Sequence, residues 1–174
     1  MNDVAPPSPP DTTRRHLVLL VILAIASLAL DLVTKGMANT KLVLGRPIDV
    51  LGDIFRLTLV HNTGTAFGLF QGMRWPFVLF SCVAVVAILV LFFRLRERTW
   101  TQVAALGLLL GGALGNLHDR ALVGAVTDFI EVGIAGHYWP VFNIADAAIT
   151  IGVALLAVGL LRPARQPASP PVVG

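Results

Sequence analysis

The chain has few charged residues and a single cysteine. Charged residues occupy 13% of its 174 positions, about half the share found in soluble domains. So little charge does not cover the surface of a water-soluble globule, and 56% hydrophobic residues exclude a disordered chain or a coiled coil. The lone Cys82 excludes an internal disulfide and a thiolate metal cluster, and we expect it to be a small packed residue. The composition predicts a protein whose solvent is a lipid bilayer.

The residues of several common hydrolytic sites are also scarce. No Ser-His-Asp set is visible, and the histidines lack the HExxH spacing of a zinc site. The net charge is +3, but the basic residues are scattered over segment ends without a basic stripe, which favours anionic lipid headgroups over nucleic acid as partners. We therefore expect no metal, cofactor or nucleic acid. The four serines are Ser8, Ser27, Ser81 and Ser169.

Long apolar runs are what the chain has instead. A membrane-spanning helix needs about 20 mostly apolar residues, and four runs approach this length. Proline-rich ends flank them: we expect a disordered leader at 1–15, a single membrane domain at 16–162 and a flexible tail at 163–174. Arg14 and Arg15 before the first run also resemble the start of a cleavable signal peptide, although three further runs favour its retention. The predicted spans are about 16–34, 75–93, 100–118 and 138–161.

The arginines near the ends of the runs predict the orientation. Cytoplasmic loops carry an excess of Lys and Arg, and here the arginines gather before the first run, between the second and third, and after the fourth. The short loop between the third and fourth runs has only Arg120. We therefore expect both termini in the cytoplasm and two loops outside. The gathered arginines are Arg14, Arg15, Arg94, Arg96, Arg98, Arg162 and Arg165.

The first outer loop has the pattern of strands. Residues 55–59 alternate apolar and polar side chains, residues 60–64 offer turn residues, and residues 65–70 form a candidate return strand. The expected fold is therefore a mainly α-helical membrane protein. It has four transmembrane helices and a small, cradle-like extracytoplasmic β-sheet, at about 46–72, between the first and second helices.

Polar residues interrupt the fourth run. An aspartate at the centre of a membrane helix costs at least about 2.5–3.5 kcal/mol, so its default interpretation is functional. Asp146 lies some eight residues into the run that begins at Tyr138. Asn143 and Thr150 would share its helix face. The pattern predicts a polar stripe near the outer end of this helix.

A second polar cluster follows the third run. Asn116 and Arg120 are four residues apart and face the same way if the helix continues, while Asp119 and Arg120 form either a local ion pair or part of a site. Asp128 is flanked by apolar residues, which is typical of a strand or turn packed against protein or membrane. Two acids, Asp128 and Asp146, thus approach the same outer boundary. Paired carboxylates that share one proton can activate water and protonate a leaving group, which is hydrolysis without a covalent intermediate.

Five stretches of the sequence form recognisable motifs: residues 31–35, 61–68, 115–120, 126–129 and 142–146. Together they resemble the lipoprotein signal peptidase (signal peptidase II) family, whose members are bacterial membrane aspartic proteases. They follow the family's order and extend from about Leu17 to Leu161, so the likeness leaves out only the proline-rich ends. Family members remove the signal peptide from prolipoproteins, cutting just before a cysteine that already carries a diacylglyceryl group.

The resemblance implies roles for individual residues. It implies that Asp128 and Asp146 are the catalytic pair, and that the protein is an inner-membrane enzyme with its site near the outer face. Its partners would be lipid-modified prolipoproteins, membrane lipids and inhibitors of the globomycin type, and we expect a monomer. The implied substrate-binding residues are Asn62, Asn116, Arg120 and Asn143, and the implied structural or orienting residues are Asp31, Lys35 and Gly64.

Two other classes of protein fit part of the pattern. Intramembrane acids are typical of small proton-coupled transporters or channel subunits, although no inverted repeat is visible. A membrane assembly factor would explain Asn143 and Thr150 as contacts to partner helices, but it gives no reason for Asp128. Cleavage of a lipidated precursor separates all three.

Overall fold

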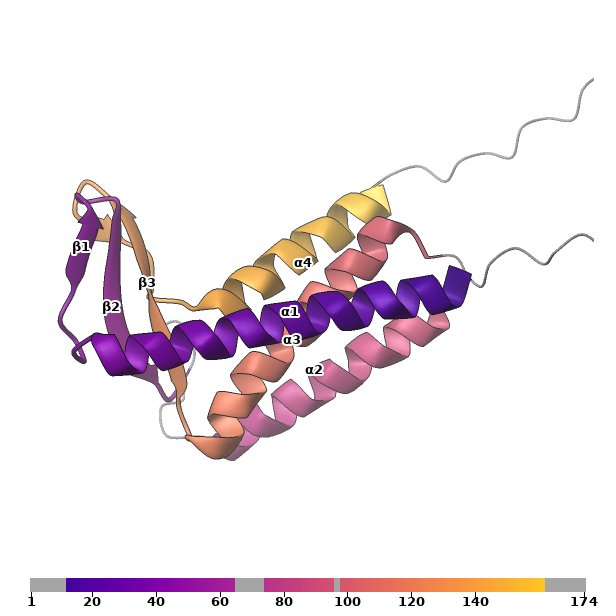
Figure 1. Ribbon diagram of the computed structural model, residues 1–174, viewed down its shortest axis with the longest axis horizontal. Helices are drawn as coiled ribbons and strands as arrows, with labels where there is room; N and C mark the ends of the chain where they lie inside the picture. The colour runs from indigo at the N-terminus through magenta and orange to yellow at the C-terminus, as the bar shows by residue number, and fades with distance from the viewer. Residues whose placement is uncertain (1–11, 65–73, 96–97, 162–174) are drawn as a thin grey trace, which may run out of the picture.

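Four helices form a bundle, and a four-stranded antiparallel sheet lies across one end of it. The computed structural model describes residues 12–64, 74–95 and 98–161. Helices α1 and α3 end beside the sheet, and α2 and α4 begin there. The start of α1 and the end of α4 lie at the opposite end of the bundle (Figure 1). In chain order the elements are α1 (Thr12–Lys41), β1 (Ile48–Leu51), β2 (Phe55–Asn62), α2 (Arg74–Arg94), α3 (Trp100–Leu122), β3 (Val126–Ile134), β4 (His137–Tyr138) and α4 (Ile144–Leu161).

The helices have the length and composition of a membrane protein. Each of α1, α2 and α3 is long and apolar enough to cross a membrane, and α4 is a shorter apolar helix over Ile144–Gly159. The other three helices all pack on α3. In the most apolar stretch of α3, 56% of the residues are buried, whereas in that of α2 only 11% are buried. Helix α3 is therefore the core of the bundle, and α2 presents most of its surface outward, as a lipid-facing helix does.

Glycines allow α3 to lie close to its neighbours. A Cβ atom at Gly111 would lie 2.6 Å from the backbone oxygen of Ala24 in α1, and one at Gly112 would lie 2.5 Å from that of Ala145 in α4. Both distances are shorter than real Cβ contacts, so a larger side chain would push the helices apart. The first turn of α4 is thereby held close to α3.

The sheet draws on two separate loops. Its strand order is β1-β2-β3-β4, with β2 paired to β3 so that Val60 lies opposite Asp128 and Asn62 opposite Val126. The predicted strand at 55–59 is confirmed as part of β2, but the expectation that the whole sheet lies between the first two helices was incomplete. A two-stranded hairpin is marginal in water, and β3 supplies its third strand. The predicted return strand at 65–70 lies outside the described residues.

Two helices differ in extent from the sequence expectation. Helix α1 begins at Thr12, so residues 12–15 are helical, not part of a disordered leader; residues 1–11 and the predicted tail at 163–174 lie outside the described residues. It also continues to Lys41, because Ala38 packs against Leu59 and Phe129 of the sheet. Helix α4 begins at Ile144, six residues after the expected start.

Candidate active site

A cavity of about 680 Å³ opens where the sheet meets the helix bundle. Its wall is mostly apolar and includes the first turns of α4, with side chains such as Ile149 and Ile151. Asp128 and Asp146 share this wall with Asn62 and Arg120. The cavity therefore combines an apolar surface along a membrane helix with a small group of polar side chains, as ligand sites commonly do.

Asp146 lies in the first turn of α4 and is held by the residue that caps this helix. The side-chain oxygen of Asn143 accepts from the backbone N–H of Asp146 at 2.9 Å, and the Asp146 carboxylate accepts from the backbone N–H of Asn143 at 3.3 Å. This reciprocal pair is a capping box. The sequence had suggested that Asn143 belongs to a polar stripe on the helix. In the structure it precedes the helix, which begins at Ile144. The N-terminal end of a helix also favours a negative charge at Asp146.

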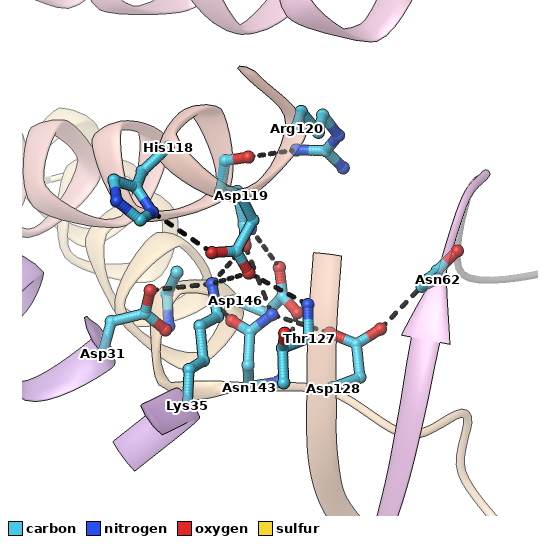
Figure 2. Close-up of polar contacts among 12 residues, drawn as sticks. Asp31, Lys35, Asn62, His118, Asp119, Arg120, Thr127, Asp128, Asn143 and Asp146 are labelled. Carbon is cyan, nitrogen blue, oxygen red and sulfur yellow. Dashed lines mark hydrogen bonds and ion pairs between the residues drawn. The ribbon is translucent and has the colours of Figure 1, made fainter. Parts of the chain in front are cut away.

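Asp128 reaches the cavity from β3, and its neighbour Asn62 reaches it from the end of β2. The Asn62 amide nitrogen donates to Asp128 Oδ2 at 3.0 Å (Figure 2). The Asn62 oxygen accepts from the backbone N–H of Gly64 at 3.0 Å, which closes an Asx turn and fixes the amide orientation. Gly64 also lines the cavity. Of the strand or turn predicted around Asp128, the structure shows a strand, and it directs this carboxylate toward Asn143 at the start of α4.

Two asparagine amides connect the carboxylates. Asn143 Nδ2 donates to Asp128 Oδ1 at 2.7 Å and to Asn116 Oδ1 at 3.2 Å. Asn116 Nδ2 donates to Asp146 Oδ1 at 2.7 Å. Both asparagines are buried and neither lines the cavity. Their amides thus contact the carboxylates from behind the cavity wall. The contact with substrate that the resemblance implies for these two residues stays a prediction.

A second group of charges lies behind these amides. Lys35 Nζ is 2.7 Å from Asp31 Oδ2, 3.1 Å from Asp119 Oδ2 and 3.1 Å from Asn116 Oδ1, with all four side chains buried (Figure 2). Asp31 Oδ1 also accepts from the backbone N–H of Ala145 at 2.9 Å, next to Asp146. Asp31 and Lys35 thus connect α1 to the start of α4 and to Asn116.

Asp119 was not among the predicted site residues. Its neighbour Arg120 suggested a local ion pair, but Asp119 pairs instead with Lys35, 84 positions earlier in the chain. Its carboxylate also accepts from the backbone N–H of Thr127 at 2.9 Å, immediately before Asp128. The one local signal for Asp119 was that it is an acid at the end of an apolar helix. Its partners come from distant segments, so no spacing in the sequence pointed to them.

Arg120 is the cation nearest the cavity. Its guanidinium makes a long contact, 3.5 Å, to the backbone oxygen of Asn116 and lies 5.6 Å from the centre of the Phe77 ring. Within residues 12–64, 74–95 and 98–161 it forms no ion pair with a carboxylate. Its donors are therefore available to a molecule in the cavity.

The two cavity carboxylates have amides, not cations, as their immediate partners. Within the described part of the chain, neither Asp128 nor Asp146 forms an ion pair. Burial, together with the nearby charge of Asp146, raises the pKa of Asp128 from 3.8 to about 7, while the amides of Asn62 and Asn143 oppose that rise. Asp128 therefore retains a proton near neutral pH. The arrangement can supply one acid and one base to the same small volume.

Comparison with known proteins gives a consistent result. A family profile described as Signal peptidase (SPase) II matches residues 23–162. The lipoprotein signal peptidase of Symbiobacterium thermophilum is 39% identical over 86% of this chain and 98% of its own length. That of Rhodococcus jostii is 43% identical, over 88% of this chain and 77% of its own.

Solved structures agree with the sequence comparison. A bacterial membrane enzyme determined by the in meso method at 2.3 Å resolution superposes with a TM-score of 0.76 at 34% identity, covering 82% of this chain and 87% of the other. A second such structure, at 1.9 Å resolution, gives the same TM-score at 33% identity, with coverages of 83% and 94%. The chain belongs to the signal peptidase II family, as the resemblance of its five motifs had predicted.

Proposed function

We propose that this chain is an aspartic endopeptidase that removes the signal peptide from diacylglyceryl-modified prolipoproteins, cutting just before the lipidated cysteine. One observation carries the proposal. Asp128, from the sheet, and Asp146, from the start of a membrane helix, share the wall of one cavity and are joined by two amides. The names of the similar proteins supply the substrate class. They give no support to a transporter or assembly factor.

The chemistry divides between the two carboxylates. We assign Asp146 as the base, because its carboxylate accepts hydrogen bonds from the Asn116 amide and from the backbone N–H of Asn143. It takes a proton from water as the water oxygen attacks the scissile carbonyl carbon, while protonated Asp128 donates to the carbonyl oxygen. The proton on Asp146 then passes to the leaving nitrogen, the C–N bond breaks, and Asp128 recovers its proton from the collapsing intermediate.

The other polar residues divide into two groups. Asn62 and Arg120 line the cavity, so we assign them to substrate contacts. Asn116 and Asn143 orient the carboxylates from behind the wall. Asp31 and Lys35 hold the helix that carries Asp146. The apolar part of the cavity along α4 would receive the signal peptide or the lipid of the substrate.

The enzyme would sit in the bacterial cytoplasmic membrane with both termini inside and the site at the outer face. Arg14 and Arg15 lie at the start of α1, and Arg94 at the end of α2, which is the end of the bundle away from the sheet (Figure 1). This placement supports a cytoplasmic location for that end. We expect the protein to act as a monomer in contact with membrane lipids and to be inhibited by compounds of the globomycin type.

The direct test uses two precursors. Purified protein in lipid is mixed with a diacylglyceryl-modified prolipoprotein and with the same precursor lacking the lipid, and the products are analysed by mass spectrometry. Only the lipidated precursor should be cut, leaving the modified cysteine as the new N-terminus, and a chelator should not change the rate. Cleavage elsewhere, equal cleavage of both precursors, or none with a correctly folded protein would contradict the proposal.

A further inference from the structure

Asn39, in the last turn of α1, contacts both strands that supply cavity residues. Its Nδ2 donates to Thr127 Oγ1 of β3 at 3.3 Å, and its Oδ1 lies 2.9 Å from His61 Nε2 of β2. Because an amide oxygen can only accept, His61 donates through Nε2–H. One side chain thus connects a helix to two neighbouring strands.

The two strand residues that Asn39 contacts are the chain neighbours of cavity residues. His61 precedes Asn62, Thr127 precedes Asp128, and His61 and Thr127 lie opposite each other in the sheet. Successive side chains in a strand point to opposite faces. Asn39 therefore holds the strand pair from the back, while Asn62 and Asp128 face the cavity.

Thr127 is the fixed point of this arrangement. The residue is buried, and its backbone N–H donates to Asp119 Oδ2 of α3 at 2.9 Å (Figure 2). A buried hydroxyl without a hydrogen-bond partner is costly, and the Asn39 amide supplies a partner for this one. Thr127 is therefore held by α3 through its backbone and by α1 through its side chain.

We propose that Asn39 is a positioning residue that, through His61 and Thr127, holds β2 and β3 so that Asn62 and Asp128 stay aligned with Asp146. The inference rests on the proposed function. It predicts that removing the Asn39 amide lowers the rate of the chemical step more than the affinity for substrate, because the residue lies behind the sheet and touches nothing in the cavity.

A double-mutant cycle tests the contact. Asn39→Ala and Thr127→Val should each lower kcat about three- to tenfold, with KM changed less than about twofold. The double variant should be no slower than the slower single variant, because Asn39→Ala already removes the hydrogen bond that Thr127→Val removes. Thr40→Ala is the matched control, since its hydroxyl bonds only to Gly36 and Met37 of its own helix among the described residues. It should leave kcat unchanged.

The second contact has its own conservative variant. His61→Gln keeps a side-chain N–H that can donate to Asn39, whereas His61→Leu removes it. The glutamine variant should retain more of the wild-type kcat than the leucine variant. Equal losses in the two variants would remove His61 from the proposal.

A readout that does not depend on activity separates this inference from the proposed function. Backbone amide exchange across residues 126–130 should be faster in Asn39→Ala than in wild type, with exchange in α3 unchanged. Wild-type exchange together with wild-type kcat would overturn the positioning role, as would additive losses in the cycle. If the wild type fails to cut a lipidated precursor, the proposed function falls, and the exchange result still decides the role of Asn39.

Discussion

Two groups of aspartates lie side by side in this protein and differ in their partners. Asp31 and Asp119 are buried against Lys35, which lies 2.7 Å from one and 3.1 Å from the other. Asp128 and Asp146 line a cavity, and their immediate partners are neutral amides. The first group is compensated and closed to solvent, so it is suited to holding helices together. The second group is uncompensated and open to a ligand, so it is suited to proton transfer.

The difference shows how one residue type acquires two roles within a single network. Asn116 touches both groups: it accepts from Lys35 and donates to Asp146. Because its oxygen already receives Lys35 and Asn143, its nitrogen must face Asp146. The closed group thereby fixes the hydrogen bonds of the open one. Mutations that remove a charged group from either group of residues are the sharpest way to test the comparison.

The largest expected effect is on activity, in the open group. Asp128→Asn or Asp146→Asn should lower kcat by at least about 10³-fold, because an amide can neither take a proton from water nor donate one as an acid. Either variant should still give folded protein in detergent, because asparagine has nearly the same size and shape as the aspartate it replaces. Turnover close to wild type in either variant would refute the carboxylate pair.

The next largest effect is on stability, in the closed group. Lys35→Met leaves Asp31 and Asp119 buried without their cation, and removing one partner from a buried ion pair costs about 3–5 kcal/mol. The measurement is the melting temperature in detergent and the yield of folded protein. Lys41→Met, at the exposed end of the same helix, is the matched control and should behave as wild type. A Lys35→Met protein as stable as wild type would show that the closed group does not support the fold.

The pH dependence of stability should also differ between the groups. Because the folded-state pKa of Asp128 is raised to about 7 from 3.8, the folded protein keeps a proton that the unfolded chain has lost between these values. Stability from this group is therefore greatest below about pH 4, falls as pH rises toward 7, and is level above it. Asp128→Asn removes this dependence, so the melting temperature of the variant should gain on wild type between pH 4 and 7.

Activity should respond to the same proton. The wild-type rate should follow a bell-shaped pH profile whose two apparent pKa values belong to the carboxylate pair, and it should fall as Asp128 loses its proton above about pH 7. Initial rates of cleavage across the acidic and neutral range check this. A flat profile, or a melting-temperature difference that stays constant with pH, would contradict a shared proton.

The smallest expected effect concerns a carboxylate outside both groups, that of Glu131 in β3. Glu131 accepts from Arg56 at 2.6 and 2.9 Å and from Thr58 at 2.6 Å, and the Arg56 hydrogen bonds lower the pKa of Glu131. A carboxyl group whose pKa is lower in the folded state than in the unfolded state stabilises the fold at pH values above its unfolded-state pKa. This stabilisation is lost as the pH falls through the folded-state pKa. Glu131→Gln should therefore lower the melting temperature by about 2–4 °C at pH 7, and the difference should shrink toward pH 3.

Local patterns made much of the fold predictable. Apolar runs identified α2 and α3 to within four residues at each end and α1 except for its last seven residues, and the alternation at 55–59 identified β2. The start of α4 could not be predicted as closely from the sequence, because residues 138–142 are as apolar as the membrane helix that follows them. Their backbone instead pairs with β3, as in the bonds between Phe142 and Ile130, and Asn143 then caps the helix.

The sequence alone determined that this is a membrane protein, that residues 12–64, 74–95 and 98–161 contain four helices, and which acids interrupt apolar segments. Hydrophobic length and the cost of a buried charge are properties of short stretches, so these features can be read locally. Tertiary structure decided which acids are paired with a cation and which are not. Lys35 meets Asp119 and Asn39 meets Thr127 across more than 80 positions, and no local pattern encodes such pairs. Whether an aspartate holds a helix or carries a proton depends on those distant neighbours, since they set its charge and its access to water.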